Sequence, residues 1–152
     1  MKKNKQGFTL IELLVVIAII GLLSTLSIVA LNQARARSRD ARRLADVKQI
    51  QTALEMYYND NYSYPPEASV APGAKIATGS TIYMDIVPKP PLPADGSGCT
   101  GSTQYTYHIQ PINGITNGSY TLQYCLGSAT GGIKPGQQVA TPSGIAQSGQ
   151  VQ

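Results

Sequence analysis

The sequence predicts an α+β protein: one long N-terminal α-helix, with a transmembrane half and an amphipathic half, packed on a small antiparallel β-sheet head. Three observations predict this fold class. Leu13–Leu31 is a run of 19 residues without a charge, close to the ~20 that a helix needs to span a bilayer. Residues 32–61 contain neither proline nor glycine. Alternating apolar and polar residues, typical of strands, come only later in the 152-residue chain.

The N-terminal stretch combines basic residues with one acid at the edge of the apolar run. Lys2, Lys3 and Lys5 precede the run, and Glu12 lies just inside its start. An ionisable side chain in a membrane segment costs up to ~3 kcal/mol on insertion scales, so it is a candidate functional residue by default. On Glu12 alone, the alternative is a signal anchor that tolerates an acid at its end.

The segment KQGFTLIELLVVIAIIGLL resembles the N-terminal signature of the type IV pilin and pseudopilin family. The matching features are the basic leader that ends in Gly7, then Phe8, Thr9, Leu10 and Glu12, and then the apolar helix. The resemblance implies that a prepilin peptidase cleaves between Gly7 and Phe8 and methylates the new amine of Phe8. It also implies that Glu12 helps a subunit to join a growing filament.

The domain plan and the partners follow from the same resemblance. It implies that the chain binds other pilin subunits, the prepilin peptidase, and the assembly platform with its motor proteins. The expected parts are a leader (1–7), a transmembrane and polymerisation helix (8–31), an amphipathic continuation (32–61), and a small β head with loops and a flexible C-terminal tail (62–152).

The chemistry of Glu12 can be argued from the residues. Cleavage would leave a cationic amine on Phe8 at the same membrane depth as Glu12. A carboxylate in hydrocarbon is costly alone and much less so beside a cation. The amine of one subunit can reach Glu12 of a neighbour only if the two helices are staggered by about one turn. We therefore expect this pair to set the assembly register more than to add stability.

The orientation of the chain in the membrane has two conflicting indications. Three lysines precede the span and five arginines follow it, so the positive-inside rule places the N-terminus outside. The resemblance instead implies a single-pass protein of the cytoplasmic membrane, with the leader in the cytoplasm and the head outside, which then joins a cell-surface pilus. We follow the resemblance. Ala34–Ala36 also has a secretory cleavage pattern, but the apolar run exceeds the usual ~7–15 residues.

Beyond the membrane the helix should continue as an amphipathic one. One apolar stripe recurs at three-to-four spacing: Leu44, Val47, Ile50 or Gln51, Leu54, and Tyr57 or Tyr58. Tyr64–Pro66 should end the helix, because proline disfavours helix in itself and in the residue before it.

Five arginines crowd the position where the helix leaves the membrane: Arg35, Arg37, Arg39, Arg42 and Arg43. We expect a solvated collar whose side chains reach lipid phosphates. The alternative is contact with carboxylates of neighbouring subunits. Asp40 and Asp46 offset the arginine charge in part.

The head should contain a short strand near residues 81–87 and an antiparallel hairpin. Apolar side chains alternate with polar ones in residues 105–110 and again in residues 120–126. Asn113–Gly114 and Asn117–Gly118 both read as turns between these two strands. Gln137–Thr141 is expected to be a last edge strand, and residues from Ser143 onward to be frayed.

Cys99 and Cys125 are expected to form a disulfide, because an exported chain with an even number of cysteines favours pairing. Closing that loop would contribute ~3.5 kcal/mol in the chain-entropy model. Strand alternation turns Cys125 away from the helix-packed face. The alternative is two free buried thiols in a cytosolic domain.

Several function classes lack support. The formal charge of +4 includes three leader lysines, which leaves 9 basic against 8 acidic side chains and no basic groove for nucleic acid. His108, the one histidine, is expected to be a surface residue of a strand. Acids are too few after Glu67 for a calcium site. We expect no enzyme, no metal site and no cofactor, and we assign the nine tyrosines to the core and rim of the head.

The sequence thus predicts a structural subunit of a type IV pilus-like filament, acting in adhesion, motility or DNA uptake. The alternative within the family is the major pseudopilin of a type II secretion or competence system. The disulfide-bearing head favours a pilin. From another class, a signal-anchored enzyme or solute-binding domain would need an acid–base constellation that the sequence does not offer.

Overall fold

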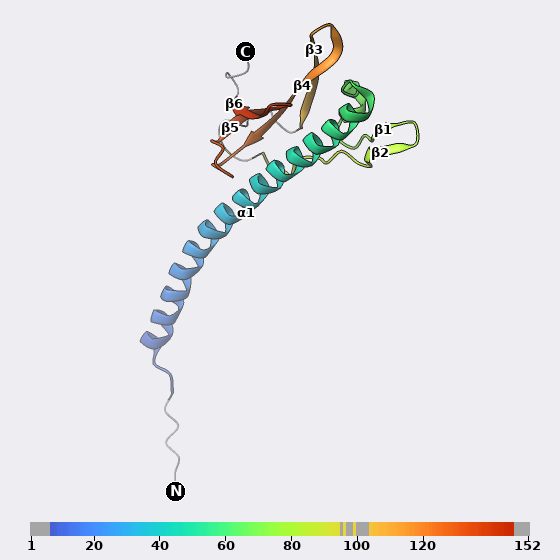
Figure 1. Ribbon diagram of the computed structural model, residues 1–152. Helices are drawn as coiled ribbons and strands as arrows, with labels where there is room; N and C mark the ends of the chain where they lie inside the picture. The colour runs from blue at the N-terminus through green and yellow to red at the C-terminus, as the bar shows by residue number, and fades with distance from the viewer. Residues whose placement is uncertain (1–6, 95, 97–98, 100–103, 148–152) are drawn as a thin grey trace. The chain divides into compact units, whose positions relative to one another are not determined.

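The protein is described by a computed structural model, which covers residues 7–94, 96, 99 and 104–147 (Figure 1). It divides into two units, Met1–Arg35 and Ala36–Gln152. One helix, α1 (Leu10–Asn61), contributes to both units. It begins two residues after the expected Phe8 and ends where the Tyr64–Pro66 segment predicts.

In the first unit, α1 carries apolar residues on every side between Leu13 and Leu31. All described residues of this unit, 7–35, are exposed. Within the part of the chain that the structure describes, α1 is the one helix that is both long enough and apolar enough to cross a membrane. Its few hydroxyls are satisfied locally: Ser24, Thr25 and Ser27 donate to carbonyls three or four residues earlier, at 2.7–2.8 Å. A hydroxyl that is bonded to its own helix can enter an apolar environment at low cost.

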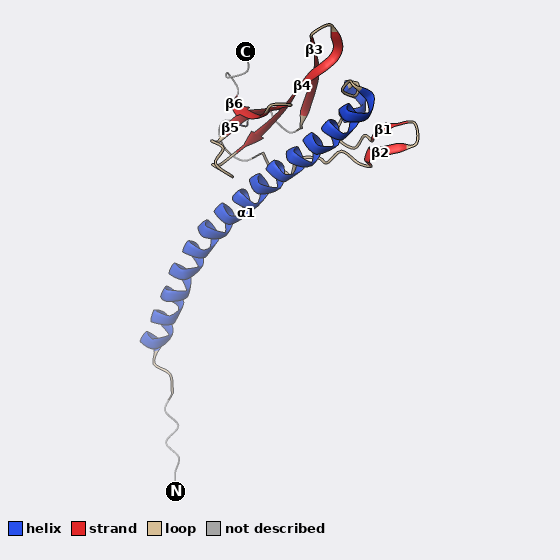
Figure 2. Cartoon of the chain, in the orientation of Figure 1, coloured by secondary structure: helices blue, strands red, loops and turns tan. Residues whose placement is uncertain are grey.

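In the second unit, α1 packs on an antiparallel head (Figure 2). A 3₁₀ turn, η1 (Glu67–Val70), follows the helix, and β1 (Ile76–Thr78) pairs with β2 (Thr81–Met84). The main sheet has the order β3-β4-β5-β6, with the bounds β3 (Thr106–Ile112), β4 (Ile115–Leu126), β5 (Gly136–Thr141) and β6 (Gly144–Gln147). This confirms the predicted α+β class.

The core joins the apolar stripe of α1 to the inner face of the main sheet. Val47, Ile50 and Leu54 of α1 are fully buried, together with Tyr120 and Leu122 of β4. The predicted alternation is confirmed in part: Tyr120, Leu122, Tyr124 and Leu126 are buried at every second position of β4, whereas in β3 Tyr107 is buried and Ile109 is half-buried. The opposite face of β4 is less open than alternation suggests, since Thr121 and Cys125 are buried as well.

The hairpin has one turn rather than the two predicted. Asn113 and Gly114 have φ angles of 51° and 80°, as a two-residue type I′ turn requires, and Ile112 pairs with Ile115 across it. The prediction of a turn at Asn117–Gly118 was wrong, because both residues lie inside β4.

Asn117 and Gly118 serve contacts that local sequence patterns do not reveal. The carbonyl of Asn117 accepts from the Tyr64 N–H at 2.8 Å, and its Nδ2 donates to the Tyr64 carbonyl at 3.2 Å. A Cβ on Gly118 would lie 2.4 Å from a methyl carbon of Ile112. The asparagine therefore fixes the chain after α1, and the glycine allows the hairpin strands to approach.

The strand predictions near the chain's second half also need correction. β5 is not the last strand and not an edge, because it pairs with β4 on one side and with β6 on the other. Residues 144–147 were expected to be frayed but form β6. The predicted strand near 81–87 is β2, and its partner β1 was not predicted. Both missed strands are short, and pairing with a neighbouring strand stabilises them more than their own sequence does.

One edge of the main sheet is partly covered. The backbone N–H of Ile109 in β3 donates to Glu67 Oε1 at 3.2 Å, and His108 Nδ1 lies 3.2 Å from the same oxygen. Pro111, also in β3, has no N–H to offer. His108 is exposed, as predicted.

Candidate functional site

The first turn of α1 is closed by a hydrogen-bonded pair, Thr9 and Glu12. Thr9 Oγ1 accepts from the Glu12 N–H at 3.3 Å, and Glu12 Oε2 accepts from the Thr9 N–H at 2.8 Å. The Thr9 hydroxyl also donates to Glu12 Oε2 at 2.6 Å. This is a capping box, in which two backbone donors at a helix start are satisfied reciprocally. It explains why α1 begins at Leu10 and shows that Glu12 binds its own chain through one carboxylate oxygen.

Gly7 and Phe8 lie before the helix, and both are exposed. A Cβ on Gly7 would meet nothing within 4 Å, and Gly7 does not have a positive φ. The described structure therefore has no packing or backbone reason for a glycine at this position.

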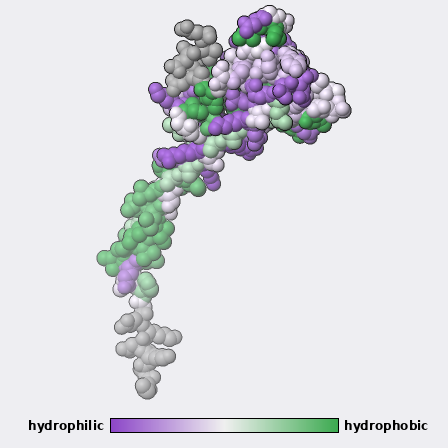
Figure 3. Space-filling view, in the orientation of Figure 1, coloured by the Kyte–Doolittle hydropathy of each residue, from purple (hydrophilic) through white to green (hydrophobic). Residues whose placement is uncertain are grey.

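The surface around Glu12 is apolar. Phe8, Ile11, Val15 and Val16 line one shallow groove together with Glu12. Farther along, the large apolar side chains of the first unit remain exposed, and Figure 3 shows this stretch of the helix in green. Monomeric soluble proteins rarely expose contiguous apolar surface on this scale. The first half of α1 therefore requires a lipid or protein environment that the single chain does not provide.

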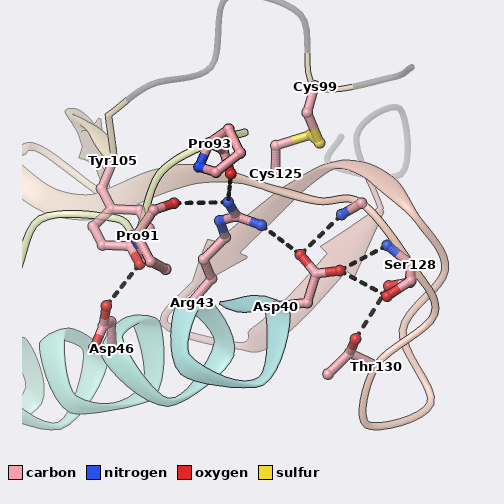
Figure 4. Close-up of polar contacts among 11 residues, drawn as sticks. Asp40, Arg43, Asp46, Pro91, Pro93, Cys99, Tyr105, Cys125, Ser128 and Thr130 are labelled. Carbon is pink, nitrogen blue, oxygen red and sulfur yellow. Dashed lines mark hydrogen bonds and ion pairs between the residues drawn. A yellow bond between two sulfur atoms is a disulfide. The ribbon is translucent and has the colours of Figure 1, made fainter. Parts of the chain in front are cut away.

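The second unit holds a polar cluster that the sequence did not predict (Figure 4). Asp40 is fully buried and Arg43 is 3% exposed. Arg43 Nη1 donates to Asp40 Oδ1 at 2.6 Å. The predicted solvated collar is therefore wrong for Arg43, whereas Arg35, Arg37 and Arg42 are exposed. Burial of Arg43 is possible because its charge is paired with Asp40 and its Nη2 also donates hydrogen bonds.

Each member of this pair also binds a loop of the head. Asp40 accepts from the Gly127 N–H at 3.0 Å, from the Ser128 N–H at 2.8 Å, and from the Ser128 hydroxyl at 2.7 Å. Arg43 Nη2 donates to the carbonyls of Pro91 at 2.7 Å and Pro93 at 2.6 Å. The two partners thus connect α1 to the loop that follows β4 and to the proline-rich loop that precedes β3.

The structure contains the disulfide between Cys99 and Cys125, and both cysteines are buried. Cys99 belongs to the same loop region as Pro91 and Pro93, and Cys125 is close in sequence to Gly127 and Ser128. The disulfide therefore joins the two chain segments that Arg43 and Asp40 bind (Figure 4).

A third polar contact of α1 lies beside this cluster. The hydroxyl of Tyr105 donates to Asp46 Oδ2 at 2.9 Å. Burial raises the pKa of Asp46, while the hydrogen bond from Tyr105 and the charge of Arg42 counteract part of that increase. Burial also raises the pKa of Tyr105, and the Asp46 carboxylate raises it further. Asp46 was expected to offset exposed arginine charge, but its own carboxylate is buried.

The tyrosines form an aromatic network in the head. Tyr64 stacks on Tyr58 with ring centroids 4.7 Å apart and meets Tyr120 edge-on at 4.8 Å. Tyr107 lies 5.7 Å from Tyr120. Most of the tyrosines serve the core and its rim, as predicted, whereas Tyr62 is 78% exposed. Among the described residues, no three His, Cys, Asp or Glu side chains are grouped to hold a metal ion.

Comparison with known proteins identifies the N-terminal features. Residues 2–28 match the family described as the prokaryotic N-terminal methylation motif. The chain is 36% identical over 64 residues to the type II secretion system core protein G of Aeromonas hydrophila, covering 42% of this chain and 45% of the relative. It is 47% identical over 87 residues to the type IV wide pilus major component PilA4 of Thermus thermophilus, covering 56% and 66%. The chain belongs to the type IV pilin and pseudopilin family.

A third relative of this pilin-family chain is the type IV major fimbrial protein FimA of Dichelobacter nodosus, 44% identical over 55 residues, which cover 36% of this chain and 35% of the relative. The chain spans less than half the length of the core protein G relatives from Aeromonas hydrophila, Pseudomonas aeruginosa and Escherichia coli. No solved structure matches the chain significantly.

Proposed function

We propose that this chain is the structural subunit of a type IV pilus-like filament and polymerises through the first half of α1. The observation that carries the proposal is the contrast within one helix: the head buries one face of residues 36–61, but residues 10–35 are mostly apolar and all exposed. A precursor can satisfy this surface with lipid, and an assembled subunit can satisfy it with the same surface of its neighbours. The methylation motif at residues 2–28 supports this assignment.

We propose that prepilin peptidase prepares the chain by cleaving between Gly7 and Phe8 and methylating Phe8. Both residues are exposed before the helix starts, so a peptidase can reach this peptide bond. The described residues give no packing reason for a glycine at position 7, which favours recognition by the enzyme. Cleavage removes the lysines of the leader and creates a cationic amine beside the capping box.

Glu12 is proposed to pair with the Phe8 amine of a neighbouring subunit. Both hydrogen bonds from Thr9 go to Oε2, and within the described residues Oε1 accepts none. The capping box therefore orients the carboxylate and leaves one oxygen for a second partner. A cation at that oxygen would compensate the charge of Glu12 inside an apolar filament core.

The proposed location follows from this chemistry. The precursor would lie in the cytoplasmic membrane with its leader in the cytoplasm and its head outside, and the mature chain would then enter a cell-surface pilus. The assembly platform and its motor proteins would extract it from the membrane.

A surface pilus is our first choice, and a pseudopilus of a type II secretion or competence system is the alternative. The identity to PilA4 is 47% over 87 residues, higher than the 34–38% identity to the core protein G relatives, one of which aligns over 95 residues. The head also has only six charged side chains after Asp60, which gives a coat of Thr, Ser, Gln, Asn and Tyr suited to contact with surfaces.

Shearing of cells at native expression tests the choice. Fibres seen by electron microscopy and built chiefly from this chain by mass spectrometry would support a major pilin. Presence of the chain in the membrane fraction alone, with a secretion or uptake defect on deletion, would support the pseudopilin. If cells show no fibres and deletion causes no secretion or uptake defect, the result would contradict a filament function.

A further inference from the structure

The Asp40–Arg43 pair is buried at a place where an apolar contact could be equally stabilising. Removing two charges from water costs several kcal/mol for each ion, and apolar replacement of a buried pair is often neutral or stabilising. Apolar side chains make contact with the head elsewhere on α1, where Val47, Ile50 and Leu54 are fully buried. The pair therefore contributes something other than burial.

An apolar stripe alone does little to fix the position of the head along the helix. Its side chains recur every three or four residues, so a shift of the head by one turn brings apolar groups against apolar groups again. Hydrogen bonds to ions do not tolerate such a shift. Asp40 requires the donors of Gly127 and Ser128, and Arg43 requires the carbonyls of Pro91 and Pro93.

The two loops are also fixed to each other. The Cys99–Cys125 disulfide connects the segments to which they belong. In addition, the loops touch at Gly96, where a Cβ would lie 2.7 Å from the Gly127 Cα. The donors for Asp40 and the acceptors for Arg43 are thus presented to α1 as one preformed surface.

We propose that Asp40 and Arg43 are positioning residues that fix the axial register of the head on residues 36–61 of α1, and that the Cys99–Cys125 disulfide holds the surface that they recognise. The register is complete only in the oxidised chain, which for an exported protein means after the head has left the cytoplasm. Its use in assembly rests on the proposed function: subunits with one register present identical heads to their neighbours.

The test measures the register directly in the full chain in detergent. Nitroxide labels that do not use cysteine are placed at Thr52 on α1 and Gln123 on β4, which are both exposed, and their distance distribution is recorded by pulsed electron paramagnetic resonance. The oxidised chain should give one narrow distribution. Asp40→Asn should at least double its width, or add a maximum displaced by about 5 Å, one helical turn.

Matched variants separate the proposal from a general loss of stability. Arg37→Gln removes an exposed arginine of the same helix and should leave the distribution narrow. The exchange Asp40→Arg with Arg43→Asp keeps an ion pair but should not restore the register, because the amide donors need an anion and the carbonyls need a cation. If Asp40→Asn unfolds the head, Arg43→Lys, which keeps the charge, replaces it in the test. Its distance distribution should likewise become at least twice as wide or gain a displaced maximum.

The disulfide is tested by repeating Asp40→Asn in a Cys99→Ser, Cys125→Ser chain. The effect should be smaller there than in the oxidised chain, since coupled groups are not additive. Equal effects in both backgrounds would overturn the coupling. A narrow, unshifted distribution in Asp40→Asn, or a register restored by the charge exchange, would overturn the positioning role. Filament formation does not enter these measurements, so failure of the proposed function would leave their result unchanged.

Discussion

Residues 10–35 and residues 36–61 of α1 differ in what their side chains contact. The first stretch carries apolar residues on all sides and leaves them exposed, and its one acid, Glu12, binds its own first turn. The second stretch buries one apolar face against the head, with Met56 left exposed, and adds a buried ion pair. The comparison teaches that one stretch is built to be satisfied by other molecules, and the other is complete within the chain.

The largest expected effect concerns processing of the bare stretch. If the proposed peptidase recognises Gly7, replacing it with a bulky residue should leave the leader attached and should abolish filaments. Intact mass spectrometry of the purified chain is the measurement, with a mature protein that begins at methylated Phe8 as the reference. Normal cleavage of the variant, or cleavage after Ala36, would contradict the assignment of the site.

Glu12→Gln should be inserted and cleaved normally but should assemble poorly. A hydrogen bond to a charged partner contributes about 1.5–3 kcal/mol, so filament yield should fall by about tenfold or more. Quantitative blotting of sheared filaments against the membrane pool measures the ratio. Thr9→Ala is the control: it removes the cap and keeps the carboxylate, and its effect should be smaller. Filament yield at the native level in Glu12→Gln would rule out the proposed pair.

Two leucines in the same helix sharpen the comparison. Leu54 is fully buried, whereas Leu22 is 64% exposed. Leu54→Ala should lower the free energy of unfolding of the head by about 2–5 kcal/mol, and Leu22→Ala should change it by less than about 0.5 kcal/mol. Chemical denaturation in detergent, followed by tyrosine circular dichroism, measures both. Leu22→Ala should instead reduce filament yield, and a variant with neither effect would break the comparison.

The smallest effect concerns Asp46. Burial raises its pKa above the ordinary value of 3.8, so the folded chain holds this proton more tightly than the unfolded chain does. The stabilising contribution is full below pH 3.8 and is lost as the pH rises through the pKa of the folded state. Asp46→Asn keeps an acceptor for Tyr105 and should be at least as stable as the native chain at pH 7. The advantage should vanish below about pH 4, and an advantage that is independent of pH would refute this cause.

The features that the sequence predicted well depend on residues that are close together in the chain. The apolar run at the N-terminus is contiguous and predicted the long exposed helix, and the alternation in β4 directly reports its buried face. The family relationship also came from this contiguous N-terminal segment.

The features that it missed depend on partners far along the chain. Arg43 was grouped with four other arginines because its acceptors lie 48 and 50 residues away. Asp40 finds its donors 87 and 88 residues later. Asn117 precedes a glycine, as in many turns, but its side chain donates to the carbonyl of Tyr64 and the residue lies inside β4. A spacing of three between Asp40 and Arg43 was the one local signal for the pair, and such spacing also occurs on exposed helix surfaces.

The covered edge of β3 matters once many copies are held together. An exposed edge strand invites pairing with another chain, and such pairing leads to irreversible aggregates. In a filament the local concentration of heads is very high, so an open edge would compete with ordered contacts. Glu67 occupies the Ile109 N–H and Pro111 has none to give. This edge therefore resists strand addition under crowding, and heads can lie side by side without fusing their sheets along it.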